Sequence, residues 1–184
     1  MLSGGSFLAS RGGAILTSAE ALGIQLLDSR ACLVSQNTIE EILGAGGPSS
    51  GQGIRLERST CKLNNNVIAR VEGDGIFLDA WSRDCLVLDN AVSDAGRDGI
   101  HVEGVQNHID RNVFNSNGSL WGGFGMHFRP GSIDNRSGRN SAVGNFGAAC
   151  IFPTVGGFPD YCDDAAPPGA VNVTFGDNLV PVLF

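Results

Sequence analysis

A repeat of twenty-odd residues runs through the middle of the chain and constrains the fold more strongly than any single motif. Each copy begins with glycine and an apolar residue and closes with asparagine, one residue and an aliphatic or aromatic residue, as in GIRLERSTCKLNNNVI, GIFLDAWSRDCLVLDNAV and GIHVEGVQNHIDRNVF. The opening glycines are Gly23, Gly53, Gly75, Gly99 and Gly125, and the closing asparagines are Asn37, Asn66, Asn90, Asn112 and Asn140. A fixed-sense repeat of this length is typical of a solenoid.

The apolar residues inside each copy alternate with polar ones, which predicts strands rather than helices. The alternation follows each glycine, as in Ile54/Leu56 and Ile76/Leu78, and a period of two gives a strand one buried face. A second alternating stretch precedes each asparagine and a third short stretch follows it. Three short strands per copy without a helix predict an all-β coil of parallel strands, with about five to six rungs.

This pattern resembles the right-handed parallel β-helix family, the pectin-lyase-like group with its secreted and periplasmic relatives. The resemblance covers residues 23–146 and is architectural rather than catalytic. It implies a right-handed coil. Polyuronate lyases of this fold hold calcium with aspartates and use an Arg or Lys base, but no such motif matches here residue by residue, and the Asp-Pro-His signature of alginate epimerases is missing. The resemblance therefore implies the fold but not the substrate.

One domain spanning residues 1–184 is expected, with less regular ends. Residues 1–22 are expected to form an incomplete first rung, residues 23–146 the regular rungs, and residues 147–184 an irregular C-terminal tail. The pattern contains no N-terminal cap. The edge of the first rung is therefore either exposed or covered by a second copy of the chain in a homo-oligomer.

The shared register of the copies stacks like residues in rows. The closing asparagines predict a ladder of side-chain amide hydrogen bonds from rung to rung. A second row contains cysteines that are expected to be buried, reduced thiols: Cys32, Cys61 and Cys85. Asn107 and Asn135 continue this second row. Cys150 and Cys162 lie outside it, and a disulfide between them would suit an exported protein.

Charge argues against nucleic acid as a partner, since 12 basic residues stand against 19 acidic ones and the net charge is −7. Such a surface repels phosphates. No apolar run approaches the length of a membrane helix. The first residues, MLSGGSFLASRGGAIL, do not form a convincing signal peptide, which needs a basic start and a long apolar core. The family resemblance nevertheless leads us to expect a secreted, periplasmic or cell-surface protein.

Two long corners, residues 43–52 and 116–124, flank copies with short corners and predict a groove over the Gly-Ile strands. The candidate catalytic residues on its floor are Asp79, Glu103 and His101. Two carboxylates about 5 Å apart beside a histidine suit acid–base chemistry. No cofactor and no metal ligands are assigned, with a divalent cation such as calcium as the alternative. The candidate substrate-binding residues are His127, Arg129, Trp121, Phe77, Arg55, Asp74 and Asp98.

Two functional classes follow from this groove. The first is an exported protein that binds polysaccharide there and, if it is an enzyme, acts as a lyase, hydrolase or epimerase. The alternative is a non-catalytic surface or periplasmic scaffold for adhesion or assembly, with metal binding as a variant, in which the acidic row is a solvated face. Because Asp79 and Glu103 would repel each other, replacing both with amides is expected to raise thermal stability and abolish binding.

Overall fold

The computed structural model describes residues 22–44 and 50–146 in full, together with the backbone of short strands nearer the two ends. Those outlying strands are β1 (Leu2–Ser3), β2 (Ser6–Leu8), β3 (Ala14–Ile15), β19 (Tyr161–Asp163) and β20 (Val173–Thr174). Cys150 lies outside the described residues, and only the backbone of Cys162 is described, so the Cys150–Cys162 disulfide stays a prediction. Within the described ranges, no helix is long and apolar enough to cross a lipid bilayer.

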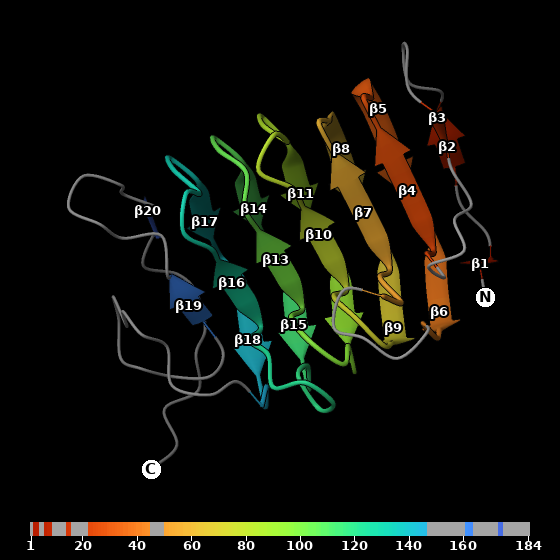
Figure 1. Ribbon diagram of the computed structural model, residues 1–184, viewed down its shortest axis with the longest axis vertical. Coiled ribbons are helices and arrows are strands. Elements are labelled where there is room, and N and C mark those ends of the chain that lie inside the picture. Colours follow the sequence, from red (N-terminus) through yellow and green to blue (C-terminus); the bar gives the residue numbers. More distant parts are fainter. Residues whose placement is uncertain are drawn as a thin grey trace.

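Each turn of the coil contains three strands that lie on three different sheets (Figure 1). The first two turns are β4 (Ile24–Leu27), β5 (Arg30–Ser35) and β6 (Thr38–Ile42), then β7 (Ile54–Glu57), β8 (Thr60–Asn64) and β9 (Val67–Val71). The next two are β10 (Ile76–Leu78), β11 (Leu86–Leu88) and β12 (Ala91–Ser93), then β13 (Ile100–Val102), β14 (His108–Asp110) and β15 (Val113–Asn115). The last is β16 (Met126–Phe128), β17 (Arg136–Gly138) and β18 (Ser141–Val143).

The turns stack in parallel, which confirms the all-β solenoid that the repeat predicts. The sheet orders are β4–β7–β10–β13–β16, β5–β8–β11–β14–β17 and β6–β9–β12–β15–β18, each extended by outlying strands. The number of turns is at or slightly below the lower end of the expected range. Beyond residue 146, β19 and β20 pair in parallel with β16 and β17, so part of the expected irregular tail continues the coil.

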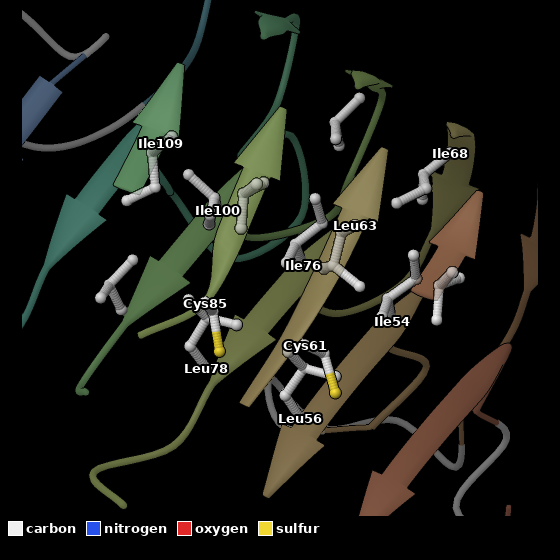
Figure 2. Packing of buried hydrophobic residues seen from close by; sticks show 14 of the residues in the cluster. Ile54, Leu56, Cys61, Leu63, Ile68, Ile76, Leu78, Cys85, Ile100 and Ile109 are labelled. Carbon is white, nitrogen blue, oxygen red and sulfur yellow. The ribbon is translucent and has the colours of Figure 1, made fainter. Parts of the chain in front are cut away.

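The core is a set of apolar columns that run along the coil. Ile54 pairs with Ile76, and Ile76 pairs with Ile100, and all three side chains are fully buried. In Figure 2 the isoleucines of neighbouring strands point into the same interior. The predicted register of the Gly-Ile strands is therefore confirmed, and their intervening residues take the outward face.

A ladder of asparagines joins the corners between the second and third strands of each turn, as predicted. From Asn66 to Asn140, each ladder Oδ1 accepts both the backbone N–H and the side-chain N–H of the asparagine one turn earlier, at 2.9–3.1 Å. The residue before each ladder asparagine has a positive φ, which turns the chain sharply: Gln36, Asn65, Asp89, Arg111 and Arg139. The ladder satisfies buried polar groups at corners that form no strand pairs.

The expectation of three reduced thiols is wrong for two of them. Cys32 and Cys61 form a disulfide between neighbouring turns, with their Cα atoms 4.7 Å apart, whereas Cys85 is a buried free thiol. Stacked turns bring equivalent Cα atoms within the range that a disulfide spans. The predicted stacking of these positions is confirmed, because the Cys85 N–H donates to Asn107 Oδ1 and the Asn107 N–H donates to Asn135 Oδ1.

The N-terminal strands also differ from the expected incomplete rung. β1, β2 and β3 pair with β6, β5 and β4, and all three pairs are antiparallel. A further rung would be parallel, so this segment instead crosses the first turn in the opposite direction. This segment pairs with the strand edges of the first turn, which were expected to be exposed or covered by a second copy of the chain. The prediction of a homo-oligomer rested on those edges.

Candidate functional site

A column of side chains crosses the outward face of the Gly-Ile sheet. Arg55, Phe77, His101 and His127 occupy equivalent positions on β7, β10, β13 and β16. The Arg55 Cζ atom lies 5.0 Å from the centre of the Phe77 ring. The ring centres are 5.2 Å apart for Phe77 and His101 and 5.3 Å for His101 and His127. The predicted neighbours are thus in contact, and we call these four residues the outward column.

Two members of the outward column are buried although they face away from the core. His101 is 1% exposed and His127 is 5% exposed. The Phe124 ring, from the corner before β16, packs edge-on against His127 with ring centres 4.8 Å apart. Two carboxylates join them, Asp98 at 1% and Asp74 at 0% exposure. The expectation that these outward residues are solvated therefore holds only for the edge of the site.

Asp98 is the hub of this buried cluster. Its Oδ2 lies 2.9 Å from His101 Nδ1 and 2.9 Å from His127 Nδ1, while its Oδ1 accepts the Phe124 N–H at 2.8 Å. The next residue is Gly99, where a Cβ atom would lie only 2.6 Å from the Gly125 carbonyl oxygen. The glycine lets successive turns approach closely, and this approach brings Asp98 within reach of groups on the following turn.

Asp74 holds the equivalent corner one turn earlier. Its Oδ1 accepts the Asp98 N–H at 3.1 Å, and its Oδ2 accepts Gln52 Nε2–H at 3.2 Å. Arg97 reaches both carboxylates, with Nη1 3.5 Å from Asp74 Oδ2 and Nε 3.8 Å from Asp98 Oδ2. Each buried carboxylate is thus paired and hydrogen-bonded, the condition under which burial of charge is tolerated.

The cluster separates the acidities of its groups. Burial, and after it the neighbouring Asp98 charge, raise the pKa of Asp74 to about 6. Burial acts in the same direction on Asp98, but hydrogen bonds from His101 and His127 outweigh it and hold the pKa of Asp98 below its usual range. Burial lowers the pKa of His101, but its bonds to Asp98 and Glu103 prevail and raise it to about 9. Without other ligands, His101 is therefore an imidazolium at neutral pH.

The predicted catalytic carboxylates have separate partners. Glu103 Oε1 lies 3.3 Å from His101 Nε2, and this hydrogen bond lowers the pKa of Glu103. Asp79 Oδ1 instead accepts the Ser82 hydroxyl at 2.7 Å and the Arg58 N–H at 3.0 Å, which fastens a corner. The replacements Asp79→Asn and Glu103→Gln keep an acceptor oxygen at both positions but remove the charge that strengthens these hydrogen bonds. These bonds oppose the expected rise in stability, which stays a prediction.

The remaining predicted residues lie around the edge. Arg55 pairs with Glu57 and donates to Gln52 Oε1 at 2.9 Å. Arg129 follows β16 and its N–H donates to the Val102 carbonyl. The Trp121 side chain is exposed, and the backbone N–H of Trp121 donates to the Gly96 carbonyl. The groove itself is not described, because residues 45–49 of one bounding corner lie outside the described ranges.

Three partners of the cluster were missed: Gln52, Arg97 and Phe124. Gln52 and Phe124 directly precede the repeat glycines Gly53 and Gly125. Asp74 and Asp98 precede Gly75 and Gly99 in the same way. This shared place before each glycine was a usable signal for Gln52 and Phe124. Arg97 carries no comparable signal, because its side chain could have turned to solvent.

Two surface hollows occur on other faces of the described residues. One of about 500 Å³ lies over β11, β14 and β17 and is lined by residues that include Leu86, His108 and Arg136. Another of about 610 Å³ lies at the neighbouring corner beside Arg58 and Trp81. Neither includes the outward column, so these hollows provide comparison surfaces for experiments on the site.

The family comparison agrees with the architecture. Residues 13–156 match the family model described as right handed beta helix region. Comparisons with curated proteins and with solved structures gave no significant match. The matched segment contains every turn from β4 to β18 and the whole buried cluster. On this match, which spans most of the chain, and on its parallel three-stranded turns, the chain belongs to the right-handed β-helix family.

Proposed function

We propose that this protein binds polysaccharide along the outward face of the β4–β7–β10–β13–β16 sheet. The observation that carries the proposal is the outward column, in which Arg55, Phe77, His101 and His127 touch one another across successive turns. An aromatic ring flanked by charged hydrogen-bonding groups is suited to a sugar, which presents apolar C–H faces and polar hydroxyls. His101 and His127 are buried, so within this column Arg55 and Phe77 are the members that a sugar could touch.

The exposed edge of the site is where a sugar could make contact. Phe77 and Arg55 are half-buried, and the Glu103 side chain is 38% exposed. Behind them, the buried Asp98 and His101 hold Glu103 in place through hydrogen bonds. Polar groups fixed in this way bind without a further loss of side-chain entropy.

Binding is supported better than processing. A catalytic group must reach the reacting atoms of its substrate, and His101 and Asp98 are almost completely buried. Lyase, hydrolase or epimerase activity would therefore require a movement that exposes His101 and Asp98 to the substrate. The same burial favours the second candidate function, a non-catalytic scaffold in which the cluster only joins successive turns.

We also propose that the protein works in an oxidising compartment, secreted, periplasmic or at the cell surface. The support is the Cys32–Cys61 disulfide, because such bonds persist mainly outside the reducing cytosol.

A polysaccharide array tests the binding proposal. The wild-type protein is expected to bind a subset of neutral or acidic polysaccharides, and Phe77→Ala is expected to weaken that binding at least about tenfold by removing the aromatic surface. Trp81→Ala is the matched control, since Trp81 is an exposed aromatic residue beside a hollow on another face. Assaying the same wells for new reducing or unsaturated ends separates binding from processing.

Two outcomes would contradict the proposal. One is the absence of binding to any polysaccharide by the folded wild-type protein, which would leave the scaffold function. The other is equal binding by wild type and Phe77→Ala with loss of binding in Trp81→Ala, which would move the binding surface to the other face.

A further inference from the structure

The geometry points to a binding site for a divalent first-row transition metal ion, such as Zn²⁺, formed by Asp98, His101 and His127. We infer this site from side-chain positions alone, and it does not depend on the proposed binding of polysaccharide. It also replaces calcium as the cation of interest, because imidazole nitrogens favour transition metals whereas calcium takes oxygen ligands.

Three potential ligand atoms converge on one point. Asp98 Oδ2, His101 Nδ1 and His127 Nδ1 all lie within 4.8 Å of one another. The two nitrogen atoms are each 2.9 Å from the carboxylate oxygen. Two ligands about 2.1 Å from one ion are about 3.0 Å apart at the right angle of an octahedral site and about 3.4 Å apart at the tetrahedral angle that Zn²⁺ prefers. A tetrahedral Zn²⁺ ion would therefore separate each pair by roughly 0.5 Å more than in the structure. The separations suit neighbouring positions around a metal, in a set of two histidines and one carboxylate.

The outer partners of these residues match those that hold metal ligands in place. Histidines that bind metals through one ring nitrogen usually donate the other N–H to a carboxylate, and ligating carboxylates are themselves hydrogen-bonded. His101 directs Nε2 at Glu103 Oε1, 3.3 Å away. The second oxygen of Asp98 accepts the Phe124 N–H at 2.8 Å. Both arrangements remain possible when Nδ1 of His101 and Oδ2 of Asp98 face a metal.

Charge also favours a cation at this point. Asp74 Oδ1 lies 3.9 Å from His101 Nδ1, so a second buried carboxylate borders the three ligand atoms. Glu103 adds a third negative group, and Arg97 is the guanidinium that reaches both aspartates. A metal binds His101 through a neutral imidazole, so binding releases the Nδ1 proton. The three carboxylates then outnumber the Arg97 cation among these groups, and a divalent ion would offset the remaining negative charge.

Equilibrium dialysis of chelator-treated protein against Zn²⁺ tests the site, with bound metal measured by elemental mass spectrometry. One Zn²⁺ per chain is expected at saturation, with little Ca²⁺ bound under the same conditions. His101→Gln and His127→Gln should each weaken Zn²⁺ binding by more than about 100-fold, and Glu103→Gln, which changes an outer partner, by roughly 10–100-fold.

The chain provides its own control, because its three histidines divide between the cluster and another face. His108 is exposed on β14 and is expected to leave Zn²⁺ binding unchanged when replaced in His108→Gln. Unchanged Zn²⁺ affinity in folded His127→Gln would overturn the site. Equal losses in His108→Gln and His127→Gln would also overturn it, since they would indicate scattered surface binding.

X-ray absorption of the Zn²⁺-loaded wild-type protein tests the site without any substitution, so misfolded variants cannot obscure the result. Two imidazole nitrogens and carboxylate oxygen are expected around the metal. Coordination by sulfur, by oxygen alone or by a single imidazole would contradict the assignment, as would the absence of bound Zn²⁺. None of these measurements contains carbohydrate, so failure of the metal site and failure of polysaccharide binding are observed separately.

Discussion

At the scale of the residue, Asp98 shows how the coil stabilises a buried charge. Its N–H donates to Asp74 on the preceding turn, and its carboxylate bonds to His101 in its own turn and to His127 and Phe124 N–H on the next. A lone buried carboxylate would be neutralised or expelled. Here the stacked corners supply partners from both directions, so the charge can persist inside the protein.

The cysteine row predicts which cysteines react with a thiol reagent in the native protein. Burial raises the pKa of Cys85 to about 12, so we expect this thiol to resist iodoacetamide in the native protein at pH 8 and to react once the protein is denatured. Peptide mapping without reduction should find the Cys32 and Cys61 peptides linked. Rapid native labelling of Cys85, or separate Cys32 and Cys61 peptides, would contradict the described row.

The isoleucine column makes a second prediction at this scale. Ile76 is fully buried between Ile54 and Ile100, so Ile76→Ala should lower the free energy of unfolding by about 2–5 kcal/mol. Leu86→Ala, at a position that is 41% exposed, is the control and should change it by less than about 0.5 kcal/mol. Urea unfolding measures both. Equal effects would mean that Ile76 is not in a packed core.

At the scale of the element, many strands are only three residues long, so each strand pair contributes few hydrogen bonds to the register of the turns. The asparagine ladder adds bonds at the corners between them. Asn90, for example, accepts two hydrogen bonds from Asn66 and donates to Asn112 and to the Leu63 carbonyl. Every polar group of this amide has a partner, so the ladder fixes the register of short strands.

Removal of one ladder amide should therefore cost more than a typical surface change. We expect Asn90→Ala to lower the free energy of unfolding by at least about 2 kcal/mol, since buried donors and acceptors on both neighbouring turns lose their partner. Asn90→Asp keeps an acceptor for Asn66 but loses the side-chain donors, so it should also lower the free energy of unfolding, by an amount that differs from that of Asn90→Ala. If thermal and urea unfolding of Asn90→Ala match wild type, the ladder does not stabilise the coil.

The elements differ in how far the sequence could predict them. The buried isoleucines, the ladder and the outward column were predicted from the sequence. Alternation sets which face of a strand a residue takes, and the shared register of the copies stacks equivalent positions. The Cys32–Cys61 bond was missed although the same register brings the two residues together. The antiparallel β1–β3 segment was missed for a different reason: residues 1–22 contain no copy of the repeat, and pairing with a distant edge is not visible in local spacing.

At the scale of the whole molecule, the candidate site combines residues from several turns. Its members were predicted as outward residues, but their burial was not. Gln52, Arg97 and Phe124, which contact the buried groups, come from three different corners. Pairwise spacing in the sequence places positions on a face; it does not say which corner side chains fold over that face. For this reason the sequence paired Asp79 with Glu103, whereas in the structure each has its own hydrogen-bond partners and Asp98 is the centre of the buried cluster.

The most direct test of the central claim, that the outward column is a ligand surface, is hydrogen–deuterium exchange with and without the polysaccharide that binds most tightly on the array. Slower exchange at backbone amides reports contact or local stabilisation. We predict slower exchange in residues 74–79, 97–103 and 121–129, with residues 84–88 and 106–110 unchanged. Slower exchange confined to the latter two segments, or no change at saturating polysaccharide, would contradict the account.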